Sequence, residues 1–199
     1  FSSIKILSGP EYLIVDKSYA ACQPNPDGPI VVSMGGSDPH DLGPSVISSL
    51  AHIRREIIWI VGPASRYAGI EAIQGLVFGD LSNVRAIQSP DSLLPYLDGA
   101  SLCITATGMT AYESLCAGVP CVLTSWSTDH LRTAEELNRR KIAIEVGTWD
   151  KFNSQSLCDS VEWLLLPENW SIRSRNARTL VDGKGAGRVA ESIVKLLNE

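Results

Sequence analysis

Six short segments of the chain are apolar almost throughout, and longer stretches of mixed character separate them. Uniformly apolar runs of this length are typical of strands that are covered on both faces, as in a parallel sheet. The predicted strands are Ile30–Met34, Ile57–Val61, Val84–Gln88, Leu102–Ala106, Cys121–Thr124 and Ile142–Val146. A further strand-like run, Tyr12–Val15, precedes them.

The intervening stretches repeat apolar residues every three or four positions, which is the spacing of amphipathic helices. This pattern predicts helices around Val46–Ile53 and Ala134–Arg140, and two more at Ser156–Leu166 and Gly187–Leu197. Strands that alternate with crossover helices form right-handed connections. The predicted fold is therefore α/β: a doubly wound, Rossmann-like parallel sheet of about six strands, with ligands at the carboxyl ends of the strands.

A cluster of Pro, Gly and Asn at Pro24–Pro29 suits a linker, so we expect a domain boundary near Asp27. The chain begins at Phe1 rather than Met. We therefore expect a piece of a longer protein, in which residues 1–28 are a linker segment from an N-terminal domain and residues 29–199 are a ligand-binding domain.

The composition narrows the function classes. The 199 residues are 44% hydrophobic. The 17 basic and 22 acidic residues give a net charge of −5, which does not favour binding to nucleic acid or to an anionic membrane. No apolar stretch approaches the roughly 18 to 20 residues of a membrane span. Five cysteines without a Cys-x-x-Cys pair indicate buried thiols in a reducing cytoplasm rather than metal ligands or nucleophiles.

The first candidate ligand loop follows the first predicted strand and reads Ser33-Met34-Gly35-Gly36-Ser37-Asp38-Pro39. Its paired glycines let a ligand approach the backbone, and its Ser and Asp can cap the next helix. A tight turn with a helix cap explains the same residues. The loop lacks the Lys-Ser/Thr ending of a P-loop, so the sequence does not support ATP or GTP hydrolysis.

The second candidate loop follows the fourth predicted strand and reads Thr107-Gly108-Met109-Thr110-Ala111-Tyr112-Glu113. Gly108 opens a predicted helix, whose unpaired N–H groups attract anions, and Thr107 and Thr110 add hydroxyl donors. Glu113, three residues after Thr110, either closes a capping box or accepts hydrogen bonds from ribose hydroxyls, and spacing alone favours the capping box.

These motifs resemble the C-terminal, nucleotide-binding half of the GT-B family. Within it the chain is most similar to the UDP-sugar hydrolases of pseudaminic acid biosynthesis and their spore coat polysaccharide relatives, and more distantly to the N-acetylglucosaminyltransferase that completes lipid II. The matching segments are Gly9–Tyr12, Ser33–Pro39, Asn83–Ile87 before Leu93, Thr107–Glu113, Ala117–Pro120 and Asp182–Ala186. The resemblance covers essentially the whole chain.

The resemblance implies a role for each matching position in UDP-sugar binding. Gly35, Gly36 and Ser37 would face the sugar and phosphates; the backbone at Ile87 and Gln88 would bracket uracil; Thr107, Gly108, Met109 and Thr110 would surround the diphosphate; and Glu113 would bind the ribose hydroxyls. An Asn-Gln pair that touches the sugar in the family corresponds here to Asp129 and His130. Residues 29–199 would then be a UDP-sugar-binding domain.

The resemblance also implies a function, namely cleavage of the sugar–diphosphate bond in surface polysaccharide or nonulosonic acid biosynthesis. No cofactor or metal ion is expected, since a helix N-terminus can stabilise the leaving UDP and the chain has no Asp-x-Asp. The catalytic base is expected in the missing N-terminal domain, because His40, His52 and His130 suit surface or helix-cap positions. The alternatives are a non-catalytic nucleotide-sugar-binding module that needs a partner chain, and a UDP-sugar 2-epimerase.

Overall fold

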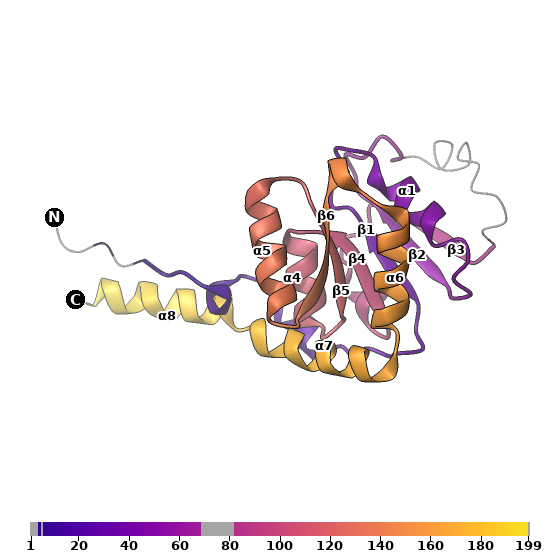
Figure 1. Cartoon of the computed structure of the whole chain (residues 1–199). Helices are drawn as coiled ribbons and strands as arrows, with labels where there is room; N and C mark the ends of the chain where they lie inside the picture. Colours follow the sequence, from indigo (N-terminus) through magenta and orange to yellow (C-terminus); the bar gives the residue numbers. More distant parts are fainter. Residues whose placement is uncertain (1–3, 5, 69–81, 199) are drawn as a thin grey trace.

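The computed structural model describes residues 4, 6–68 and 82–198, and these form a single parallel sheet with helices on both faces (Figure 1). The strand order in the described part is β3-β2-β1-β4-β5-β6, and every neighbouring pair is parallel. The strands are β1 (Ile30–Ser33), β2 (Ile57–Val61), β3 (Val84–Gln88), β4 (Leu102–Ala106), β5 (Cys121–Ser125) and β6 (Ala143–Thr148). The predicted fold class is confirmed, and β2, β3 and β4 have the predicted bounds.

The α-helices that connect the strands lie on opposite faces of the sheet. Helix α1 (Leu42–Ser49) and helix α6 (Ser154–Leu164) cover one face, and α3 (Leu94–Leu97), α4 (Met109–Cys116) and α5 (Thr128–Arg139) cover the other. Within β1, Ile30 and Val32 pack on the α1 face while Val31 packs on the α4 face. This alternation explains why three successive positions, Ile30–Val32, are all apolar.

The chain ends in two helices, α7 (Pro167–Leu180) and α8 (Gly185–Leu197). The sequence pattern predicted α8 two residues short and did not predict α7. The face that α7 buries carries Arg173, Ser174, Ala177 and Leu180, and this largely polar or small set lacks the apolar stripe on which the prediction depended. Pro167 stands at the first turn of α7, where a missing N–H costs nothing.

The segment before β1 packs on the sheet through short 3₁₀ turns, η1 (Pro10–Tyr12) and η2 (Lys17–Ala21). Val15, Tyr19 and Cys22 are buried in the core on the α4 face. The predicted strand at Tyr12–Val15 does not form, since Leu13 N–H closes the η1 turn on the carbonyl of Pro10. All five cysteines are buried and unpaired, as predicted.

A glycine in the loop after β2 positions the first candidate ligand loop. A Cβ atom at Gly62 would overlap the carbonyl oxygens of Gly35 and Gly36, so the two loops pack backbone against backbone. The N–H of Ala64 donates to the carbonyl of Gly36 at 2.8 Å. The position after β2 therefore has room only for glycine.

Gly62→Ala is expected to destabilise the domain by roughly 1–3 kcal/mol, because the added methyl group forces the Gly35–Gly36 loop away. Urea unfolding measures the change. The control is Gly187→Ala, whose Cβ enters open space in α8 and should stabilise the domain by about 0.5–1 kcal/mol. Equal stability of the two variants would contradict this account of Gly62.

Candidate functional site

The loop after β1 presents an open backbone above the sheet. Gly35 has a φ of +83°, which favours glycine, and nothing lies within 4 Å of a Cβ placed at Gly35 or Gly36. The carboxylate of Asp38 accepts hydrogen bonds from the N–H groups of Leu42 at 2.9 Å and Gly43 at 2.8 Å, which confirms its predicted capping of the next helix. Burial raises the pKa of Asp38, and these two N–H groups oppose the rise.

The loop after β4 leads directly into α4. Gly108 precedes the helix in an extended conformation, with open space beside it. The first backbone hydrogen bond of the helix runs from the N–H of Ala111 to the carbonyl of Gly108. The N–H groups of Met109 and Thr110 therefore belong to the first turn, where helix N–H groups have no intrahelical partner and attract anions.

The capping box that spacing favoured for Thr110 and Glu113 does not form. Helix α4 begins at Met109, its N-cap residue is Gly108, and no side chain caps it. Thr110 is already inside the first turn and Glu113 lies a turn beyond it, so neither has capping-box geometry. The ribose interpretation of Glu113 is the one that this geometry leaves open.

Glu113 is a half-buried carboxyl group between α4 and the segment before β1. Its burial raises its pKa, and the neighbouring hydroxyl of Tyr19, which favours the carboxylate, opposes the rise. The same hydroxyl interacts with Ser92 and with the backbone of Leu93 in the loop after β3. Tyr19 thus connects Glu113 with the end of β3, where Ile87 and Gln88 lie.

Ile87 and Gln88 end β3, which is an edge strand. Ile87 packs against the core on the α4 face. The side-chain amide nitrogen of Gln88 is buried and has no hydrogen-bond partner among the described residues, an unusual state for a buried donor. The N–H of Ser89 donates to the carbonyl of Val61 at 2.8 Å and fixes the chain where it leaves the sheet.

Thr107 is built into the sheet rather than turned outward. Its hydroxyl donates to the carbonyl of Thr124 at 3.1 Å and lies 3.1 Å from the hydroxyl of Ser125, and its N–H also donates to Thr124. Thr107 is 4% exposed. The hydroxyl that we expected to serve a phosphate instead connects the ends of β4 and β5.

Asp129 and His130 lie in the exposed first turn of α5. The Ser127 hydroxyl accepts the N–H of His130 at 3.3 Å and caps the helix. Asp129 forms an exposed ion pair with Arg132 at 3.5 Å. Because β5 pairs with β4 in parallel, this turn and the α4 N-terminus both lie at the carboxyl ends of the strands.

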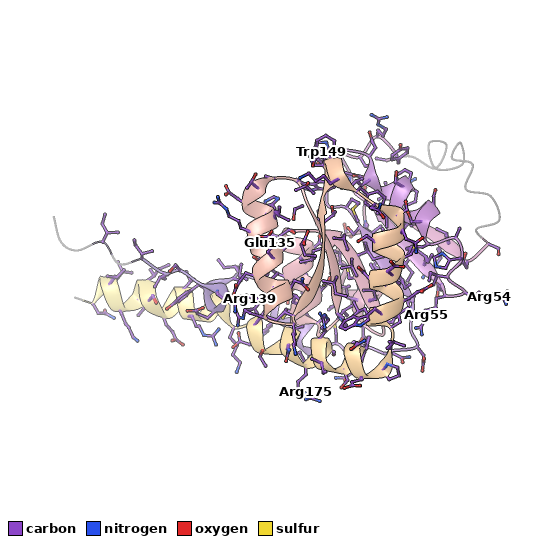
Figure 2. All side chains as sticks on the ribbon, viewed as in Figure 1. Arg54, Arg55, Glu135, Arg139, Trp149 and Arg175 are labelled. Atoms are coloured by element: carbon purple, nitrogen blue, oxygen red, sulfur yellow. The ribbon has the colours of Figure 1, made fainter. Side chains whose placement is uncertain are left out.

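A cluster of aromatic rings at the carboxyl ends of the strands was not predicted from the sequence. The ring of His40 stacks in parallel on Trp149 with a centroid distance of 3.7 Å, and Trp126 lies 5.4 Å away in a tilted arrangement. Trp149, labelled at the top of Figure 2, follows β6, Trp126 follows β5, and His40 belongs to the loop after β1. His40 is therefore part of an aromatic wall rather than a helix cap. The positions of these rings, two to six residues after predicted strands, were the available signal.

Among the described residues, no helix is long and apolar enough to cross a membrane. No three His, Cys, Asp or Glu side chains within residues 4, 6–68 and 82–198 gather in a geometry that could hold a metal ion.

The fold is that of GT-B glycosyltransferases. MurG of Acinetobacter baumannii matches 98% of this chain and 57% of its own, with a TM-score of 0.69 and 16% identity. The calicheamicin glycosyltransferase CalG4 matches 87% of this chain and 44% of its own, with a TM-score of 0.65 and 21% identity. These likenesses confirm the predicted GT-B architecture.

The chain is also a homologue of the spore coat polysaccharide biosynthesis protein SpsG of Bacillus subtilis (strain 168). The two are 25% identical over 206 aligned residues, which cover 98% of this chain. The predicted resemblance to the spore coat polysaccharide proteins is confirmed. The chain spans 60% of the length of SpsG and 57% of that of MurG. No protein-family model matches it.

The effect of the Tyr19 hydroxyl on Glu113 can be measured by titration. Tyr19→Phe should raise the pKa of Glu113 further, because it removes the hydroxyl that favours the carboxylate. A ¹³C-NMR titration of the Glu113 carboxyl measures this shift. Tyr12→Phe, which changes a tyrosine of η1, is the matched control and should leave the titration where it is in the wild type. An unchanged Glu113 titration in Tyr19→Phe would contradict the contact.

Proposed function

We propose that this chain is the donor-binding half of a UDP-sugar hydrolase or glycosyltransferase of surface polysaccharide or nonulosonic acid biosynthesis. The observation that carries the proposal is the juxtaposition of the open α4 N-terminus with Glu113 one turn further along the same helix. A diphosphate needs N–H donors, and a ribose needs an acceptor for its two hydroxyls. One helix supplies both.

The diphosphate would lie against Gly108 and the N–H groups of Met109 and Thr110. The Thr110 hydroxyl adds a donor, while Gly35, Gly36 and Ser37 face the same crevice from the loop after β1. Charge develops on UDP as it leaves the sugar, and a preorganised helix N-terminus stabilises that charge without reorganisation. The chain's own contribution to cleavage is therefore binding, orientation and stabilisation of the leaving group.

The uracil would bind beside the end of β3, where Tyr19 brings the loop after β3 near Glu113. The backbone edges of Ile87 and Gln88 would pair with the pyrimidine. The sugar would lie toward Asp129 and His130 of α5. The aromatic wall of His40, Trp126 and Trp149 offers apolar ring surface at the same edge of the sheet.

A second domain would complete the cleft. The chain spans 60% of the length of SpsG, and large apolar side chains remain exposed on α8 and on the segment beside it. They are Ile4, Ile6, Ile14, Ile193, Val194, Leu196 and Leu197. Figure 1 shows α8 and this segment projecting together from the sheet domain. In the full-length protein this surface would face the N-terminal domain, which would supply the acceptor site and the catalytic base.

The proposed enzyme is a cytoplasmic protein without a cofactor, and its activity requires both halves. An assay of UDP release by the full-length protein separates this proposal from a non-catalytic nucleotide-sugar-binding module. Isothermal titration of the present chain with UDP and ADP tests the binding half. UDP is expected to bind more tightly, and equal affinities would overturn the proposed role of the β3 end.

Glu113→Gln should weaken UDP by about 1–3 kcal/mol, because the amide cannot make charge-assisted bonds to both ribose hydroxyls. Isothermal titration compares UDP with 2′-deoxy-UDP on the wild type and the variant. Glu135→Gln is the matched control, since Glu135 lies on the exposed face of α5 (Figure 2). Wild-type protein that binds both nucleotides equally well would remove Glu113 from the site.

Uridine affinity should fall as the pH drops from neutral through the raised pKa of Glu113. The ionised carboxylate accepts the ribose hydroxyls, and burial raises the pKa of Glu113 above the usual value of about 4.3. Binding is therefore strongest above this raised pKa and is lost as the pH falls through it. Uridine carries no phosphate whose own titration would interfere. A pH series by isothermal titration should be flat for Glu113→Gln, and a flat wild-type series would argue against the ribose role.

A further inference from the structure

Arg173 of α7 is a buried cation without a counter-ion. It is 7% exposed, its Nε atom is buried, and it makes no hydrogen bond or ion pair with any described residue. Its guanidinium group lies 4.5 Å from the ring centre of Trp163, and burial lowers its pKa. An arginine stays charged in proteins, so a buried guanidinium with unused donors is costly unless an anion meets it.

Arg173 lines a pocket of about 780 Å³ that is separate from the candidate UDP site. Its lining residues come from α5, β6, α6 and α7. Asn138 near the end of α5 and Ile144 near the start of β6 lie toward the amino end of β6, whereas Asn153, Gln155 and Ser156 around the start of α6 lie toward its carboxyl end. The pocket shares no lining residue with the proposed UDP site.

The remaining lining is suited to a hydroxylated ring. Asn138 contributes an amide and Ser160, one turn before Trp163, a hydroxyl, while the pocket's acidic residue, Asp159, accepts a hydrogen bond from the Gln155 amide at 2.8 Å. Amides and a carboxylate together donate to and accept from ring hydroxyls. Trp163 is 43% exposed although Arg173 lies over its ring, so indole surface remains for the apolar side of a ligand.

We infer that this pocket binds a small cyclic polyhydroxylated anion, a sugar acid or a sugar phosphate, with Arg173 pairing the anionic group. The Asp159 carboxylate would repel a bare anion but accepts hydrogen bonds from ring hydroxyls, so it selects for a ligand that carries both. The inference does not depend on UDP binding, because it uses no residue of that site.

Isothermal titration with glucuronate, glucose 6-phosphate, glucose and inorganic phosphate tests the inference on the wild-type chain. At least one of the two sugar anions should bind ten-fold or more tightly than glucose and than phosphate, and the tighter of the two shows whether a carboxylate or a phosphate is preferred. Saturating UDP should leave this affinity unchanged. Failure of both sugar anions to bind, phosphate binding as tightly as they do, or competition by UDP would overturn the inference.

Arg173→Met should weaken the sugar anion at least ten-fold, while Arg175→Met should not, since Arg175 is exposed on the same helix (Figure 2). A second measurement uses the wild-type protein, so it does not require that the Arg173 variant folds. The indole N–H signal of Trp163, assigned as the one absent from Trp163→Phe, should shift on titration with the sugar anion. An unmoved Trp163 signal, or equal affinity of a folded Arg173→Met variant, would contradict the assignment.

Discussion

The parallel pairing of β1 with β4 at the centre of the sheet is the constraint on which the candidate site depends. Chain order reverses there, so the connection after β1 leads to α1 on one face and the connection after β4 leads to α4 on the other. The register pairs Ser33 with Thr105, so the two strands end at nearly the same level. The glycine loops that follow therefore begin at the same end of the sheet, which is the end where doubly wound sheets bind their ligands.

Some polar groups in the loops after β1 and β4 form bonds inside the fold, and others remain free to contact a ligand. Thr107 was expected to serve a phosphate and Asp38 to cap a helix, and both side chains bond to backbone groups inside the fold. Gly35, Gly36 and Gly108 have open space beside them. Buried side chains thus fix the two loops, and their exposed backbone groups would contact a ligand. Because these backbone groups are already held in place, binding would cost little conformational entropy.

The sequence predicted the strands well because β1, β2, β4 and β5 are buried at every position and so consist mostly of apolar residues. It did not predict α7, whose buried face includes Arg173 and Ser174. The loops of the site were predictable from their place after strands, whereas the roles of individual side chains depended on contacts across the sheet. The stack of His40 on Trp149 joins residues more than a hundred positions apart, and no local pattern encodes such a contact.

The chain has a net charge of −5, which repels anions, but this repulsion and the attraction of local donors act over different distances. The net charge acts over distances that salt screens beyond about 8 Å at physiological ionic strength. The N–H groups at the start of α4 and the guanidinium of Arg173 act within hydrogen-bond distance, where screening is weak. Arg173 is in addition buried, which strengthens its attraction for an anion. The overall charge therefore does not favour extended polyanions such as nucleic acid, whereas the two proposed positions would act on small anions at short range.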